Sequence, residues 1–199
     1  MNLIIGVAGF SGSGKSTFSK LLSQALDCPV ISQDDFYIGR AAMVLRGMDG
    51  NNFDVPESLE LNALIGLYRE LKENGCYEGL IPDYDYISQS VMGKKNLKIE
   101  RHVVVDGNLI HTVDSLLSYV DFLIYIDVSA IVAKSRRILR DTSRTGFTVD
   151  ESEAYYTKYV VPSNSGISNL KSKADYVVDA SGDEKSYLSQ LRLVIEKIH

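Results

Sequence analysis

A phosphate-binding pattern near the amino terminus is the feature most directly tied to chemistry. Residues 9–16 read Gly-Phe-Ser-Gly-Ser-Gly-Lys-Ser and match every fixed position of G-x-x-x-x-G-K-[ST]. Such glycines let successive backbone N–H groups point inward as an anion-binding nest at the start of a helix. The long side chain of Lys15 can reach the β and γ phosphates, and the Ser16 hydroxyl is a hard oxygen ligand suited to magnesium. The pattern therefore predicts a site for a nucleotide triphosphate.

The flanking residues favour this interpretation over a glycine-rich turn that merely joins a strand to a helix. Residues 3–8 are mainly apolar, as in a buried strand, and residues 16–26 carry apolar side chains at helical spacing. We therefore expect a strand, a glycine loop and a helix in that order, with Lys15 also acting on the phosphates during transfer. The expected nucleotide-binding residues are Gly9, Ser11, Gly12, Ser13, Gly14, Lys15, Ser16 and Thr17.

Acidic side chains follow three further apolar runs, at 28–32, 102–106 and 121–127, each typical of a buried strand. The acids at or just after the ends of these runs are Asp34, Asp35, Asp106 and Asp127. Parallel strands bring their carboxyl ends to one edge of a sheet, so these acids are expected near the phosphate loop. Magnesium and a base for an attacking hydroxyl both call for such groups. The alternatives are local: Asp34 could cap a turn, Asp106 could cap a strand end, and we interpret Asp127 as structural.

A basic segment stands out in this acidic chain, because residues 134–144 hold five of its 21 lysines and arginines. Arg136, Arg140 and Arg144 are four residues apart and would share one face of a helix. They could close over a triphosphate and stabilise the charge that develops during transfer. The alternative is a solvated helix face with no role in chemistry.

The order of elements predicts an α/β fold, a mainly parallel sheet with helices on both sides. Segment 38–55 is rich in Gly and Asn and is expected to form a long loop or lid-like insertion. We expect a helix to open at Pro56 and stop near Gly75, and residues 76–101 to be irregular. A last strand at 174–179 precedes a carboxyl-terminal helix, and with no linker in between, residues 1–199 are expected to form a single domain.

Composition limits which partners and which cellular location are expected for the protein. The formal net charge of −5 argues against a general attraction to nucleic acid or to an acidic membrane surface. No apolar run approaches the roughly 20 residues of a membrane span, so a cytoplasmic protein is expected. Cys28 and Cys76 are too few for a disulfide framework or zinc site, and we interpret both as packing residues.

Taken together, these segments resemble the uridine kinase family of P-loop kinases over nearly the whole chain. The ordered anchors are residues 9–17, 32–37, 52–54 with Pro56, 82–86, 106–107, 136–141 and 174–176. The resemblance implies a three-layer sandwich of the P-loop NTPase type. It also implies an acceptor-binding insertion at about 38–101 and a mobile lid at about 134–150.

The resemblance also suggests a role for individual residues. Asp34 would be the general base for a nucleoside 5′-hydroxyl, and Asp106 would orient magnesium where the family usually has glutamate. Asp54 would bind the ribose hydroxyls, which a carboxylate can accept in pairs. The implied catalytic residues are Asp34, Lys15, Arg140 and Arg144; the metal ligands are Ser16, Asp34 and Asp106; the acceptor-binding residues are Asp54, Tyr37, Tyr84 and Gln89; and Arg137 joins the nucleotide-binding set.

Three positions depart from the family pattern. Gln89 lies in the stretch 87–90 where the family carries a histidine, although its amide can still hydrogen-bond a base edge. Phe147 follows the lid glycine in place of arginine, and Val161 precedes Pro162 in place of a basic residue.

The expected function is ATP- and Mg²⁺-dependent phosphorylation of the 5′-hydroxyl of a riboside, with uridine or cytidine favoured. One alternative is a kinase of another small metabolite such as nicotinamide riboside, since the Asp34-Asp35-Phe36 turn resembles that neighbouring group. Another is a nucleotide-binding regulatory protein without acceptor activity. The expected partners are the small riboside and a second copy of the chain, not nucleic acid or a membrane.

Overall fold

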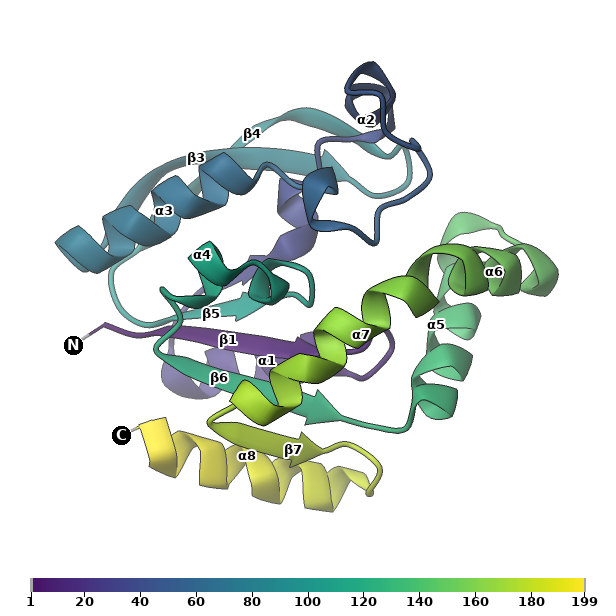
Figure 1. Cartoon of the computed structure of the whole chain (residues 1–199). Helices are drawn as coiled ribbons and strands as arrows, with labels where there is room; N and C mark the ends of the chain where they lie inside the picture. Colours follow the sequence, from purple (N-terminus) through teal and green to yellow (C-terminus); the bar gives the residue numbers. More distant parts are fainter. Residues whose placement is uncertain (1, 199) are drawn as a thin grey trace.

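A five-stranded parallel sheet forms the centre of the molecule in the computed structural model, which describes residues 2–198 (Figure 1). Its strand order is β2-β5-β1-β6-β7, and every neighbouring pair is parallel. The strands are β1 (Ile4–Gly9), β2 (Val30–Ser32), β5 (Val103–Asp106), β6 (Phe122–Asp127) and β7 (Tyr176–Asp179). All were expected from their apolar runs, and the α/β prediction with a mainly parallel sheet is confirmed.

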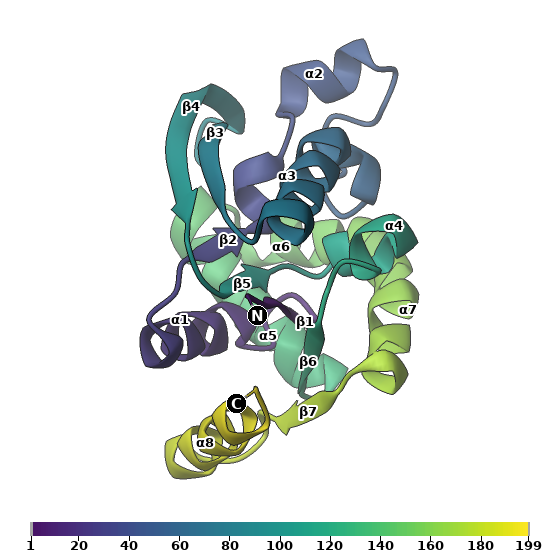
Figure 2. The same ribbon diagram turned by 90° about the vertical axis from the view of Figure 1, so that its left-hand side faces the viewer.

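Helices cover both faces of this sheet, which makes the fold a three-layer sandwich. On one face Ile5 and Val7 of β1 pack with Phe18 of α1 (Lys15–Leu26) and Val194 of α8 (Glu184–Ile198). On the other face Ala8 packs with Ile167, which belongs to α7 (Val161–Asn169). Figure 2 shows α1 and α8 on one side of the strands and α4 (Asp114–Leu117) and α7 on the other.

Residues 76–101, expected to be irregular, instead form an antiparallel hairpin of β3 (Tyr77–Asp85) and β4 (Ser90–Ile99). The prediction was wrong because only Ile81 and Ile99 of the hairpin are buried, so its strands lack a strong apolar alternation. Gly79, Pro82 and Gly93 also lower its apparent strand propensity. The β3 strand packs against the turn that carries Asp34.

Segment 38–55 and the residues after it differ from expectation in detail. A short helix, α2 (Arg40–Leu45), interrupts the expected loop, and Pro56 opens a single 3₁₀ turn, Pro56–Ser58. The long helix α3 begins only at Leu61 and ends at Asn74, before the left-handed Gly75. The buried side chains of α3 belong to the same hydrophobic cluster as Ile81 and Ile99 of the hairpin.

The remaining helices follow β6 and lie at one end of the sheet (Figure 1). They are α5 (Ala130–Thr145), α6 (Val149–Tyr155) and a π-helical turn, Tyr156–Val160, that continues directly into α7. Within residues 2–198, no helix combines the length and apolar character that crossing a bilayer requires. Cys28 packs partly against the core, whereas Cys76 is exposed, so the packing interpretation of Cys76 was wrong.

Candidate active site

The phosphate loop has the strand-loop-helix geometry that its sequence predicts. Gly14 adopts a left-handed conformation with φ of 98° and caps the amino end of α1, where backbone N–H groups are free to bind an anion. Gly12 has φ of 88°, and a Cβ there would stand 2.2 Å from the carbonyl oxygen of Ala133. Only glycine therefore fits between the loop and the first turn of α5. The Oγ atom of Ser13 is buried without a hydrogen-bond partner among the described residues, as expected at an anion cradle.

A cavity of about 370 Å³ opens beside this loop. It is large enough for a small-molecule ligand and brings together most of the residues singled out from the sequence. Those lining it are Ser11, Lys15, Ser16, Asp34, Tyr37, Asp54, Tyr84, Gln89, Asp106, Arg137, Arg140 and Arg144. Gly9, Gly12, Ser13, Gly14 and Thr17 are not part of its lining.

Lys15 lies at the nucleotide end of the cavity with two carboxylates in its field. Burial lowers the pKa of Lys15, and the charges of Asp106 and Asp34 oppose that shift. Arg140 and Arg137 lower the pKa further. Three cations and two acids thus act on one another here, and the negative charge of a bound triphosphate would be attracted to the cations.

Asp34 follows β2 in a 3₁₀ turn, Gln33–Phe36, and its backbone N–H donates to the Ser32 Oγ at 3.2 Å. Its side chain is open to the cavity but surrounded by protein. Limited hydration raises the pKa of the Asp34 carboxyl; Lys15 acts in the opposite direction, and nearby Asp106 adds to the rise. A carboxylate with a raised pKa is a better proton acceptor near neutral pH. The adjacent Asp35 pairs instead with Lys95 of β4.

Gln33, which sequence reasoning missed, joins the turn of Asp34 to the loop after Asp106. Its Oε1 accepts the backbone N–H groups of Asn108 at 3.1 Å and Leu109 at 2.8 Å. Its amide nitrogen donates to the Tyr37 hydroxyl at 3.2 Å. A buried amide with these partners fixes the two acid-bearing loops relative to each other.

The residues near Asp106 fit a magnesium ion. Asp106 is buried, and its Oδ1 has no hydrogen-bond partner among the described residues, an arrangement that an ion or bound water would satisfy. The Ser16 hydroxyl and Asp34 line the same cavity. No three His, Cys, Asp or Glu side chains cluster as a metal site anywhere in residues 2–198. Magnesium fits this pattern, because it usually takes one or two protein ligands and completes its shell with waters and phosphates.

A buried ionic cluster joins segment 38–55 to α5. The guanidinium of Arg137 donates to both carboxylate oxygens of Asp54, at 3.1 and 3.2 Å, and to Asp141 at 3.2 Å. It also lies 5.4 Å from the ring centre of Tyr155. Although burial lowers it, the pKa of Arg137 is raised overall by Asp54 and Asp141. The cluster holds Asp54 and Arg137 at the cavity wall in one geometry.

Arg140, one turn further along α5, reaches toward the phosphate loop. It donates to Asp141 Oδ1 at 3.1 Å and to the Ser11 Oγ at 3.4 Å. Arg144 also lines the cavity, whereas Arg136 lies outside the lining and donates to the Ser13 carbonyl at 3.5 Å. Of the three arginines expected to share one helix face over a triphosphate, Arg140 and Arg144 line the cavity and Arg136 does not, and their action during transfer stays a prediction.

Aromatic rings form a wall of the cavity. Tyr37 packs edge-on against Phe53, with ring centres 5.3 Å apart, and contacts Tyr84 at 5.4 Å. Tyr86, Tyr155 and Tyr159 complete the aromatic lining. Burial raises the pKa of Tyr37 well above its usual value, so its hydroxyl stays protonated.

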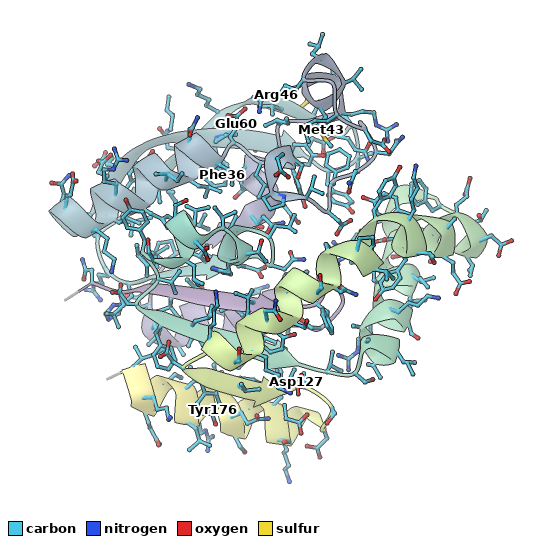
Figure 3. The ribbon with its side chains drawn as sticks, viewed as in Figure 1. Phe36, Met43, Arg46, Glu60, Asp127 and Tyr176 are labelled. Atoms are coloured by element: carbon cyan, nitrogen blue, oxygen red, sulfur yellow. The ribbon has the colours of Figure 1, made fainter. Side chains whose placement is uncertain are left out.

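Asp127 belongs to a different region. It forms an ion pair with Lys171 at 2.8 Å and is not part of the cavity lining. Figure 3 shows Asp127 and Tyr176 in the lower part of the view, on the opposite side of the molecule from Met43 of α2 and from Arg46, which follows that helix. The interpretation of Asp127 as a structural residue agrees with this placement.

Several lining residues were not singled out as site residues from the sequence, namely Gln33, Arg40, Phe53, Tyr86, Asn108, Asp141, Tyr155, Lys158 and Tyr159. Asp141 carried one usable signal, since it stands four residues after Arg137 on a predicted helix. Tyr155 and Tyr159 carried none, because their spacing of four residues is ordinary helical spacing and does not distinguish a cavity lining from a core or solvated helix face.

The family model described as "Phosphoribulokinase / Uridine kinase family" matches residues 4–186. The chain belongs to the phosphoribulokinase/uridine kinase family. Uridine kinase from Oceanobacillus iheyensis is 29% identical over 98% of this chain and 95% of its own length. Uridine kinase-like protein 5 from Arabidopsis thaliana is 30% identical over 90% of this chain. The chain spans only about two fifths of the length of the Arabidopsis relatives.

Solved structures agree on the fold of this phosphoribulokinase/uridine kinase family member. A candidate fructose transport system kinase from Silicibacter sp. TM1040 superposes with a TM-score of 0.74 at 20% identity, covering 88% of this chain and 89% of that one. A candidate uridine kinase from Bacillus stearothermophilus gives 0.58 at 20% identity, over 89% of each chain. The resemblance inferred from the sequence and its P-loop kinase fold are thus confirmed.

Proposed function

We propose that this protein is a kinase that transfers the γ-phosphoryl group of ATP to the 5′-hydroxyl of a riboside, with uridine or cytidine favoured. The observation that carries the proposal is the single cavity shared by the phosphate loop, Asp34 and the Asp54–Arg137 pair. Family membership and the bacterial relatives named uridine kinase support the same chemistry. The proposed setting is the cytoplasm, and a homo-oligomer is part of the proposal.

Each proposed role follows from a position in the cavity. The acceptor oxygen would attack the γ-phosphorus while its proton passes to the Asp34 carboxylate, and the bond to the β-phosphate oxygen would break to release ADP. Lys15, Arg140 and Arg144 would stabilise the charge on the phosphoryl oxygens. A bound magnesium ion, held by Ser16 and Asp106, would supply further positive charge at the β and γ phosphates. Arg137 would reach the nucleotide only on its cavity side, since Asp54 and Asp141 already bind its guanidinium.

The acceptor would lie between the aromatic wall and Asp54. Arg137 donates to both Asp54 oxygens and the Tyr155 hydroxyl bonds the same carboxylate, so one lone-pair position of Asp54 remains for an acceptor hydroxyl. Tyr37 and Tyr84 offer flat faces and hydroxyls on the opposite side. A sugar carrying an aromatic base satisfies both kinds of surface, whereas a plain polyol leaves the aromatic wall unused.

The test is to incubate the purified protein with ATP, magnesium and separate ribosides, including uridine, cytidine and nicotinamide riboside, and to detect monophosphates by mass spectrometry. A uridine or cytidine monophosphate supports the proposal, and loss of that product in Lys15→Ala ties it to the phosphate loop. A product from nicotinamide riboside alone would replace the proposed acceptor. No product from any riboside, with ATP binding intact by calorimetry, would favour a regulatory nucleotide-binding protein.

A further inference from the structure

The phosphate loop contacts the carboxyl-terminal helix through one tyrosine. The Tyr187 hydroxyl of α8 donates to the Gly14 carbonyl oxygen at 3.1 Å, a hydrogen bond between residues 173 positions apart. The same carbonyl also accepts the backbone N–H of Phe18 at 3.1 Å. The first turn of α1 therefore already gives this oxygen one partner, and the tyrosine supplies a second donor to its other lone pair.

Packing fixes the position of the Tyr187 hydroxyl. The Tyr187 ring meets the ring of Phe18 edge-on, with ring centres 5.5 Å apart and ring planes at 79°. Phe18 is buried in a hydrophobic cluster that α1 and α8 share, and both helices lie on the same side of the sheet (Figure 2). Burial raises the pKa of Tyr187 to about 12, so its hydroxyl keeps its proton and donates at neutral pH.

A second side chain donates to the preceding carbonyl of the loop. The Arg136 guanidinium of α5 donates to the Ser13 carbonyl oxygen at 3.5 Å. Two successive loop carbonyls thus accept hydrogen bonds from two different helices. Neither Tyr187 nor Arg136 belongs to the cavity lining, so both donors reach the loop from outside the cavity.

These contacts act on the N–H groups at the start of α1. A peptide unit is planar and trans, so its carbonyl and its N–H group point in opposite directions. The Gly14 carbonyl shares its peptide unit with the Lys15 N–H, and the Ser13 carbonyl shares its unit with the Gly14 N–H. The first N–H groups of a helix have no intrahelical partner. A donor on each carbonyl therefore orients and polarises an N–H group that is available to an anion.

We infer that Tyr187 is a positioning residue for the phosphate loop: its hydroxyl holds the Gly14 carbonyl so that the Lys15 N–H points at a bound phosphate. The inference rests on the nucleotide-binding part of the proposed function and deepens it. Loss of the hydroxyl should weaken binding of the phosphate chain itself, whatever is attached to that chain. A tyrosine that instead contacted the adenosine part of ATP would act on nucleotides alone.

The experiment measures, by calorimetry, the affinity of the purified protein for ATP and for inorganic triphosphate, each with magnesium. Tyr187→Phe removes the hydroxyl and keeps the ring on Phe18. Its affinity for both ligands should fall about fivefold, which corresponds to one hydrogen bond between uncharged groups. In steady-state kinetics the KM for ATP should rise by about the same factor. The kcat and the KM for the riboside should not change, because a contact made equally before and during transfer affects binding alone.

Tyr176→Phe is the matched control, since it also removes one tyrosine hydroxyl. Tyr176 packs against the same hydrophobic cluster as Tyr187, at the start of β7. Its ring lies 5.3 Å from the Nζ of Lys197, at the opposite end of α8 from Tyr187. The control should keep the parental affinity for both ligands, and the thermal midpoints of the two variants should agree.

The outcomes separate the inference from the activity on which it builds. An unchanged affinity of Tyr187→Phe for inorganic triphosphate, with or without a loss for ATP, overturns the inference and leaves the riboside kinase proposal standing. An equal loss of affinity in Tyr176→Phe does the same. If no riboside is phosphorylated while Tyr187→Phe alone binds both ligands less tightly, the kinase proposal fails and the inference stands. No binding of either ligand by the parent protein overturns both.

Discussion

The two ends of the cavity are built in different ways. At the nucleotide end, Lys15 and Asp106 stand at the carboxyl edge of the parallel sheet. Lys15 lies in the phosphate loop and begins α1, and Asp106 ends the buried strand β5. At the acceptor end, Arg40 and Tyr86 are exposed, and they lie on α2 and on a hairpin whose strands pair only with each other in the described sheets. The groups proposed to transfer phosphate thus rest on the core, while those proposed to bind the acceptor rest on peripheral segments.

Lys15→Ala should produce the largest effect, because it removes the cation that meets the phosphates during transfer. Turnover is expected to fall about 10³-fold. The thermal midpoint should not fall, since the charged form of Lys15 is disfavoured in the folded protein. Steady-state kinetics and thermal unfolding check the two halves of this prediction. Parental turnover in the variant would falsify the role given to the phosphate loop.

Arg137→Met tests the cluster that joins the two ends. The change leaves the buried carboxylate of Asp54 without its cation, while Asp141 keeps its pair with Arg140, and breaking a buried pair costs about 3–5 kcal/mol of unfolding free energy. Urea unfolding measures the loss. Lys134→Met, on the same helix but in an exposed pair with Glu153, is the matched control and should cost less than about 1 kcal/mol. Similar losses in both variants would contradict the structural weight given to the cluster.

Asp34→Asn should separate activity from stability. Turnover is expected to fall about 10²-fold or more, because an amide cannot take the hydroxyl proton. The folded protein raises the pKa of Asp34, so it binds this proton more tightly than the unfolded chain, and the ionised side chain lowers stability as pH rises through the folded pKa. The variant should therefore have a higher thermal midpoint at pH 7. Asp35→Asn, the neighbouring control, should lose much less turnover.

His111 should make the unfolding free energy of the protein fall in acid, and this effect should be smaller than the preceding ones. Burial beside Gly6 lowers the pKa of His111 to about 4, while the unfolded value is about 6.5. The stabilisation that comes from keeping His111 neutral is fully present above about pH 6.5. It is lost as pH falls toward 4, at about 1.4 kcal/mol of unfolding free energy per pH unit. His111→Phe should flatten unfolding free energy against pH between 6.5 and 4.5. A slope equal to that of the parent would show that other groups cause the acid sensitivity.

The same division between the two ends of the cavity separates what could be predicted from the sequence from what could not. Buried strands leave continuous apolar runs, and the phosphate loop is contiguous, so the sheet and residues 9–16 could be predicted from local pattern alone. The hairpin could not, because few of its side chains are fully buried and because its pairing is a relation between two segments rather than a property of either.

The contacts within the site were less accessible than its members. Asp54 and Arg137 could be named from the sequence, but their pairing joins residues 83 positions apart. The hydrogen bond between Arg40 and Gln89 joins residues 49 positions apart. Gln89 also has a left-handed backbone, which its residue type does not predict. Residue type predicted which groups are present, whereas tertiary packing decides which of their atoms remain available to a ligand.

The close approach at Gly12 limits how the basic segment can move. The carbonyl of Ala133 rests on the phosphate loop, and one turn later Arg137 is tied to Asp54 on a distant segment. Helix α5 is thus held at two points, beside the phosphate loop at Ala133 and beside the acceptor segment at Arg137. A shift of the whole helix would therefore disturb the contact with the phosphate loop and the ion pair with Asp54 together.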